Sequence, residues 1–321
     1  MLSKQKILDS IKSVVEQSSF VSIDEEAIDR YVKGFASQEI IHWTKGSNAY
    51  PLGYKPQPNK EDEIDFLFLL ANQAFCYWGY PQKWTISFRG QNLDGWWANI
   101  AAFERAIEQG NNILDGNFLA NLTLEKTREI YAGEPEIPLL KERYEMMKKI
   151  GEVLVAKYQG HFHNFFEEYR TDAFRMMEGL STEFAGFYDV PKYKGNSVLF
   201  YKKTQVFLTD VAYFDKPLPK TDEILGFADY KIPAIMRTLG FLKYSKPLAE
   251  KVDNRVELAE ASGEEIEIRA NMLMASYLTV EKLRPKYPKL NYVDFLGILW
   301  LESQDKTKID KPYHLTKTVY Y

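Results

Sequence analysis

An acidic residue among aromatic side chains is the strongest candidate for chemistry in this sequence. Asp229 lies in the segment 226–233 (GFADYKIP), between Phe227 and Tyr230, and the closing proline suits the first turn of a helix. Near the positive end of a helix dipole a carboxylate stays ionised, and Lys231 adds positive charge. An ionised carboxylate beside an aromatic wall can stabilise, or attack, a developing oxocarbenium carbon. An ordinary helix-capping aspartate is the alternative interpretation.

Two adjacent lysines form a second candidate. Lys202 and Lys203 lie in the segment 200–205 (FYKKTQ), where they offer point charges that suit a phosphate group. A solvated basic edge on an amphipathic helix explains the same residues equally well. The sequence leaves both interpretations open.

The sequence gives less support for a metal site or for a reactive cysteine. His161 and His163 are two residues apart, a spacing that places side chains on one face of a strand but on roughly opposite faces of a helix. Because the surrounding segment has helical spacing, we expect no metal pair there. Cys76 lies in an apolar segment and is expected to be a buried thiol. No phosphate loop or dinucleotide fingerprint is present, and no cofactor is predicted.

The elements that must position these residues are mainly helical. Apolar residues repeat at steps of three and four most clearly over 140–158. A proline- and glycine-rich loop is expected over 43–60. Strands are predicted only at 84–88 and 266–268, and helices are predicted at 7–15, 28–35, 61–78, 96–107, 161–180, 198–214, 233–239, 270–283 and 292–302. We therefore expect a mainly α fold with a few short β strands, built as one compact domain over 1–321 whose N-terminal helical layer (about 1–80) packs on the remainder.

Composition limits the class of partner. The chain has 321 residues, 45 acidic against 41 basic side chains and a single cysteine. This balance provides no basic surface for nucleic acid, and no apolar segment resembles a secretion signal or a membrane span. A lone cysteine excludes an intramolecular disulfide. We expect a cytoplasmic protein that binds a small molecule, without nucleic acid or membrane as a partner.

Short motifs in a fixed order extend over most of the chain. They are FCYW at 75–78, FRG at 88–90, GWW at 95–97, FYKK at 200–203, FADYKIP at 227–233, EIEIR at 265–269 and the final YY at 320–321. Together they resemble the queuosine salvage protein family, whose members act as queuosine 5'-phosphate N-glycosylase/hydrolases. The resemblance implies a helical fold similar to helix-hairpin-helix DNA glycosylases, acting on a free nucleotide, with queuine and ribose 5-phosphate as products and no metal or organic cofactor.

The resemblance also implies roles for particular residues. Asp229 corresponds to the catalytic nucleophile of the family, and Phe227 to a ring that stacks on the deazaguanine base. Asp294 and Phe295 match an acid and an aromatic residue that contact the base. The predicted substrate-binding set comprises Phe227, Asp294, Phe295, Tyr230, Lys231, Lys202 and Glu302.

Some positions depart from the family pattern. Ala71 and Ala74 stand where many relatives carry an aspartate and an asparagine, and residues 44–47 after Trp43 contain no histidine to contact a ligand. Glu302 is displaced relative to the second C-terminal acid of the family. These departures keep two alternatives open: a diverged glycosidase for another purine or deazapurine nucleotide, and a non-catalytic nucleobase-binding protein.

Overall fold

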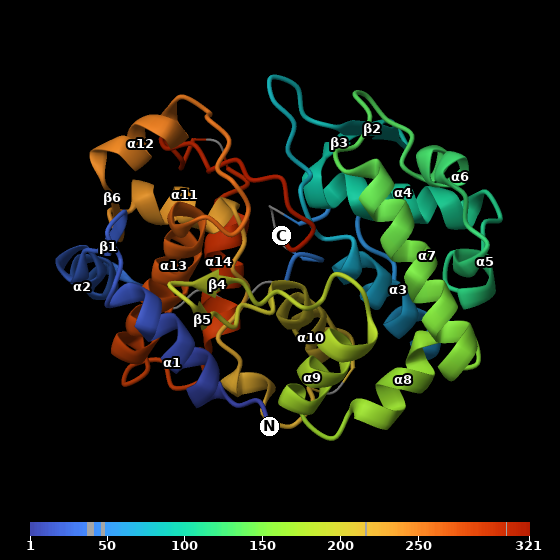
Figure 1. Ribbon diagram of the computed structural model, residues 1–321, viewed down its shortest axis with the longest axis horizontal. Coiled ribbons are helices and arrows are strands. Elements are labelled where there is room, and N and C mark those ends of the chain that lie inside the picture. The colour runs from blue at the N-terminus through green and yellow to red at the C-terminus, as the bar shows by residue number, and fades with distance from the viewer. Residues whose placement is uncertain (37–41, 46–48, 216, 306) are drawn as a thin grey trace. The chain divides into compact units, whose positions relative to one another are not determined.

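The computed structural model describes residues 1–36, 42–45, 49–215, 217–305 and 307–321, and it confirms the mainly helical fold class (Figure 1). The chain divides into two compact units. The first comprises Met1–Ala49, Asp189–Gln205 and Lys220–Lys317, and the second comprises Tyr50–Tyr188, Val206–Pro219 and Thr318–Tyr321.

The first unit is built around one long helix. Its elements are α1 (Lys4–Val15), β1 (Val21–Ile23), α2 (Glu25–Gly34), β4 (Lys192–Tyr193), β5 (Asn196–Ser197), η1 (Thr221–Glu223), α11 (Lys231–Thr238), β6 (Leu242–Tyr244), α12 (Lys246–Asp253), α13 (Gly263–Leu283) and α14 (Tyr292–Glu302). Helix α13 contacts α1, α2, α11 and α14. The strands pair as antiparallel β1–β6 and β4–β5.

The predicted strand at 266–268 is wrong, because these residues belong to α13. The Ser262 side chain accepts the backbone N–H of Glu265 at 3.3 Å and caps the helix. Ile266 and Ile268 are both buried, although they point in very different directions from the helix axis. Neighbouring elements surround this helix, so burial extends around its circumference and no helical period is visible in the sequence.

A buried ion pair connects α13 to the segment that leads into α10 (Lys202–Phe214). The Arg269 Nη1 atom lies 3.1 Å from Asp189 Oδ1, and both side chains are almost completely buried. The Asp189 carbonyl accepts the backbone N–H groups of Phe200 and Tyr201, and its carboxylate accepts that of Lys202 at 3.3 Å. Asp189 thereby determines where α10 begins.

The second unit is also mainly helical. Its elements are α3 (Lys60–Asn72), β2 (Thr85–Phe88), β3 (Gln91–Asp94), α4 (Gly95–Glu108), α5 (Gly116–Ala120), α6 (Leu124–Ile130), α7 (Leu140–Lys157), α8 (Phe162–Tyr169), α9 (Ala173–Glu183) and most of α10. The amphipathic helix predicted over 140–158 and the strand predicted at 84–88 are confirmed as α7 and β2.

Helix α3 ends at Asn72, earlier than the predicted residue 78. The fully buried Arg143 of α7 donates hydrogen bonds to the carbonyl groups of Gln73, Phe75 and Cys76. These carbonyl groups therefore accept hydrogen bonds from a side chain distant in sequence, and they do not continue the hydrogen-bond pattern of α3. Cys76 is buried, as predicted.

Within the described residues, no helix combines the length and the apolar character needed to cross a bilayer. The single domain with an N-terminal layer, and the likeness to helix-hairpin-helix DNA glycosylases, stay predictions.

Replacing Arg269 tests the buried ion pair. We expect Arg269→Met to lower the free energy of unfolding by about 3–5 kcal/mol, because Asp189 and Glu265 are left buried without their shared cation. Urea denaturation followed by circular dichroism measures the change. Adding Asp189→Asn should recover part of the loss, since the amide keeps an acceptor for the Lys202 N–H.

The exposed Arg30 of α2 offers a matched control. Arg30→Met should change the free energy of unfolding by less than about 0.5 kcal/mol. If Arg269→Met and Arg30→Met lowered the free energy of unfolding by similar amounts, the structural role assigned to Arg269 would be contradicted.

Candidate active site

A glycine turn delivers Asp229 to the start of α11. Gly226 has a φ of +95°, and a Cβ atom there would lie 2.4 Å from the Leu296 side chain of α14. Only glycine fits both the conformation and the space. The Gly226 N–H donates to Gln205 Oε1 at 2.8 Å, and Gln205 donates to the Phe200 carbonyl at 2.7 Å. The turn is therefore held by the first residues of α10 and by α14.

The two oxygens of the Asp229 carboxylate have different surroundings. Oδ1 accepts the backbone N–H of Lys231, the first residue of α11, at 2.7 Å. Oδ2 lies 4.0 Å from the Lys202 ammonium nitrogen. One oxygen is thus a helix-terminus acceptor and the other faces a cation. The capping interpretation and the chemical interpretation are compatible, because they use different atoms.

The interpretation of the lysine pair as a solvated basic edge is wrong. Lys202 and Lys203 are only 5% and 1% exposed. Buried ammonium groups require compensating charge or hydrogen bonds, and Asp229 supplies a carboxylate to Lys202. Opposite charges about 4 Å apart attract by about 4 kcal/mol at an effective dielectric of about 20. This attraction stabilises the contact between Lys202 and Asp229.

Lys231 and Tyr230 make contacts that the sequence did not indicate. The Lys231 ammonium donates to Gln304 Oε1 at 2.6 Å and lies 5.9 Å from the centre of the Trp300 ring. Its backbone N–H is the group that binds Asp229. Tyr230 is buried, with its ring centre 5.2 Å from that of Tyr313. Lys202 is therefore the ammonium that the structure pairs with Asp229.

Asp294 lies in the first turn of α14, where the Asn291 side chain accepts its backbone N–H at 2.8 Å. Burial raises the pKa of Asp294 to about 6, and a backbone hydrogen bond with Asn291 opposes the rise. The next side chain, Phe295, is fully buried and its ring centre lies 6.1 Å from that of Tyr31. Phe227 is only partly buried, so it is the predicted stacking ring that retains exposed surface.

Glu302 follows Phe295 by seven residues and shares its face of α14. Its carboxylate lies 4.0 Å from the Lys308 ammonium. Burial, and then the negative charge of Glu302, raise the pKa of Tyr31. Tyr31 thus lies near both predicted residues. The sequence presented it only as part of an apolar helix face, so nothing marked it as a neighbour of this site.

The positions that depart from the family pattern lie in both units. Ala71 and Ala74 are buried in the second unit, and Trp43 is buried in the first. Residues 46 and 47 of the loop after Trp43 lie outside the described residues.

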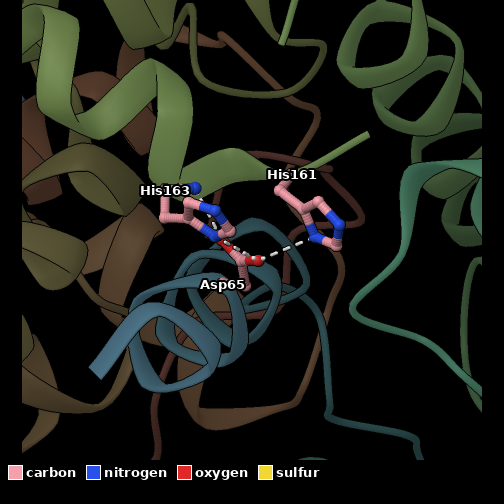
Figure 2. Close-up of side chains that lie close together, drawn as sticks. All are labelled: Asp65, His161 and His163. Carbon is pink, nitrogen blue, oxygen red and sulfur yellow. Dashed lines mark hydrogen bonds and ion pairs between the residues drawn. The ribbon is translucent and has the colours of Figure 1, made fainter. Parts of the chain in front are cut away.

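The expected separation of His161 and His163 is wrong. Helix α8 begins at Phe162, and His161 precedes it with an extended backbone. The two rings stack at 5.0 Å and both approach Asp65 (Figure 2). Elsewhere, His314 is buried, and burial together with the charge of Arg269 lowers its pKa to about 3, so its imidazole is neutral at physiological pH.

The fold and these residues define a class: a mainly helical protein with a buried carboxylate–lysine pair at a helix start, next to a partly exposed aromatic ring. A family model described as queuosine salvage protein matches residues 54–321. This match extends over more than half of the chain, so the protein belongs to the queuosine salvage protein family.

Curated relatives resemble the chain over nearly its whole length. A protein of Sphaerobacter thermophilus named queuosine 5'-phosphate N-glycosylase/hydrolase is 33% identical, with 98% of this chain and 97% of that protein covered. Proteins of the same name from Nematostella vectensis and Mus musculus are 28% and 26% identical, with at least 98% of each chain covered. The resemblance inferred from the motifs is confirmed.

Replacing Asp294 tests how much the burial of its carboxylate lowers the stability of the fold. The folded protein holds a proton on Asp294 up to about pH 6, whereas the unfolded chain releases it near pH 3.8. Stability therefore falls as the pH rises from 3.8 to 6, by at most about 3 kcal/mol. We expect Asp294→Asn to raise the melting temperature at pH 8 by several degrees and to have little effect near pH 4, as measured by calorimetry.

Asp222, an exposed acid of η1, provides the control. Asp222→Asn should leave the melting temperature unchanged at both pH values. Equal effects of Asp294→Asn at pH 4 and pH 8 would contradict the assigned cause.

Proposed function

We propose that this protein hydrolyses the N-glycosidic bond of queuosine 5'-phosphate and releases queuine and ribose 5-phosphate for salvage. Membership of the queuosine salvage family and the names of its relatives support the substrate. The observation that carries the proposal is the buried Asp229 carboxylate, which has one oxygen held by the Lys231 N–H and the other near Lys202.

The chemistry of the substrate explains the need for such a carboxylate. An ordinary purine leaves more readily after protonation at N7, but a 7-deazapurine has carbon at this position. The enzyme must therefore stabilise the sugar cation by other means. A negative oxygen against the anomeric carbon provides this stabilisation, and it is better placed for the task when it is fixed before the substrate arrives.

In the proposed reaction Asp229 is the nucleophile. Its Oδ2 atom attacks the anomeric carbon as the glycosidic bond breaks, and the bonding electrons leave with the base. Water then attacks the anomeric carbon of the glycosyl ester, and the ester C–O bond breaks and restores the carboxylate. The proton that water gives up neutralises the released base. The hydrogen bond from Lys231 to Oδ1 keeps the carboxylate oriented throughout.

The other predicted residues form the proposed substrate site. Phe227 stacks on the base, and Asp294 hydrogen-bonds its amidine N–H groups or its aminomethyl cation. A wrong base would leave buried polar groups unpaired, which provides specificity. The remaining members are Phe295, Tyr230, Lys231, Lys202 and Glu302, and the hydrolysis requires no metal or cofactor.

We further propose that the substrate is a free nucleotide and that the reaction takes place in the cytoplasm. The net charge of −4 supports a small substrate instead of a nucleic acid. The single, buried Cys76 is compatible with a reducing compartment.

Removing the charge of Asp229 tests the proposal. We expect the wild-type protein to release queuine from queuosine 5'-phosphate, and Asp229→Asn to reduce the rate at least about a thousandfold. Asparagine can still accept the Lys231 N–H, so the start of α11 should persist. Mass spectrometry of the released base measures the rate, and Asp222→Asn is the control with unchanged activity.

The same assay separates the alternatives. Release of another base from a parallel set of purine and deazapurine nucleotides, without release of queuine, would show a diverged glycosidase. Ligand-dependent thermal stabilisation without bond cleavage would show a binding protein. Undiminished turnover by Asp229→Asn would exclude the proposed nucleophile.

Lys202→Met tests the partner of that nucleophile. Because the ammonium lies 4.0 Å from Asp229 Oδ2, we expect kcat to fall at least tenfold, by about the same factor for queuosine 5'-phosphate and for queuosine. A rise in KM confined to the phosphorylated substrate would assign Lys202 to the phosphate instead. Lys246→Met, at a fully solvated lysine of α12, should change neither constant.

A further inference from the structure

Three side chains with metal-ligating atoms gather in the second unit, apart in sequence from every residue of the proposed reaction. Asp65 lies on α3, His163 lies in the first turn of α8, and His161 immediately precedes that helix. Figure 2 shows both imidazoles directed toward the Asp65 carboxylate. One ligand atom from each residue lies within 4.8 Å of the others.

The distances suit a shared ion. Asp65 Oδ2 lies 3.0 Å from His163 Nδ1 and 3.5 Å from His161 Nδ1. Two ligand atoms that each lie about 2.0–2.1 Å from a tetrahedral zinc ion are about 3.3 Å apart. The two observed separations bracket this value, so small side-chain rotations would admit an ion between the three atoms.

The carboxylate is already oriented for this role. Asp65 is only 2% exposed, and its Oδ1 accepts the His163 backbone N–H at 2.6 Å. Its Oδ2 is left directed at the two rings. Within the described part of the chain, the buried Nδ1 atom of His161 has no hydrogen-bond partner. A buried carboxylate and a buried ring nitrogen both gain from a cation placed between them.

We propose that Asp65, His161 and His163 bind a divalent transition-metal ion of the zinc type, with water completing the coordination. Two imidazole nitrogens and one carboxylate oxygen form a donor set that suits Zn²⁺. The His161 and His163 side chains are 41% and 23% exposed, which leaves a path for the ion and for water.

The site serves to fasten the start of α8 to α3. These helices pack against each other in the second unit, whereas Asp229 and the other residues of the proposed reaction belong to the first. Metal binding should therefore stabilise the fold, and the proposed hydrolysis does not depend on it chemically.

Titration of the full-length, untagged protein tests the site. After treatment with a chelator and its removal, we expect Zn²⁺ to bind with a stoichiometry of one in isothermal titration calorimetry and to raise the melting temperature. Co²⁺ should produce visible absorption bands of a low-coordinate nitrogen and oxygen site. Absence of saturable binding would overturn the proposal and leave an ordinary aspartate–histidine pair.

Variants identify the ligands. His161→Gln, His163→Gln and Asp65→Asn should each lower the affinity for Zn²⁺ at least about tenfold. His161 is the most exposed of the three, so His161→Gln should fold normally, which circular dichroism verifies. His42 is one of the two histidines outside the proposed site, and His42→Gln should leave binding unchanged. If His42→Gln lowered the affinity for Zn²⁺ as much as the ligand variants do, or if His161→Gln left it unchanged, the assignment would be overturned.

Discussion

The buried pair of Arg269 and Asp189 is the interaction on which the arrangement of the candidate active site depends. An ion pair removed from water adds little stability unless further hydrogen bonds satisfy its charged groups. Asp189 also accepts three consecutive backbone N–H groups at the start of α10. The pair thereby links the middle of α13 to Lys202. Because Lys202 faces Asp229, a constraint in the core of the first unit determines the electrostatics of the proposed nucleophile.

Asp229 shows how a structural role and a proposed chemical role can share one carboxylate. Its Oδ1 satisfies a backbone donor at the start of α11, and this contact limits rotation of the side chain. Because the side chain is held at Oδ1, the same contact keeps Oδ2 facing the Lys202 ammonium. The tight turn at Gly226, which has no room for a Cβ beside Leu296, brings the chain into this position. Orientation before binding is what an electrostatic or nucleophilic role requires.

The histidine pair of the second unit depends on a helix boundary. Sequence periodicity places helix ends only to within a residue or two, and the start of α8 between His161 and Phe162 reverses the expected geometry. An extended residue before the first turn can direct its side chain to the same side as a helical residue two positions later. The strand wrongly predicted within α13 has a related cause, since a helix buried all round shows no period.

The sequence by itself determined the mainly helical class, the amphipathic helix α7, the strand β2 and the family. Periodicity depends on residues close in the chain, and the order of the motifs is a property of the sequence whatever its packing. The sequence also placed Asp229 at a helix start. The tertiary structure alone decided that Lys202 is buried against Asp229, that Tyr31 lies near Glu302, and that both histidines meet Asp65. These outcomes depend on which distant elements pack together, and a side chain's burial and charge partners are properties of that packing.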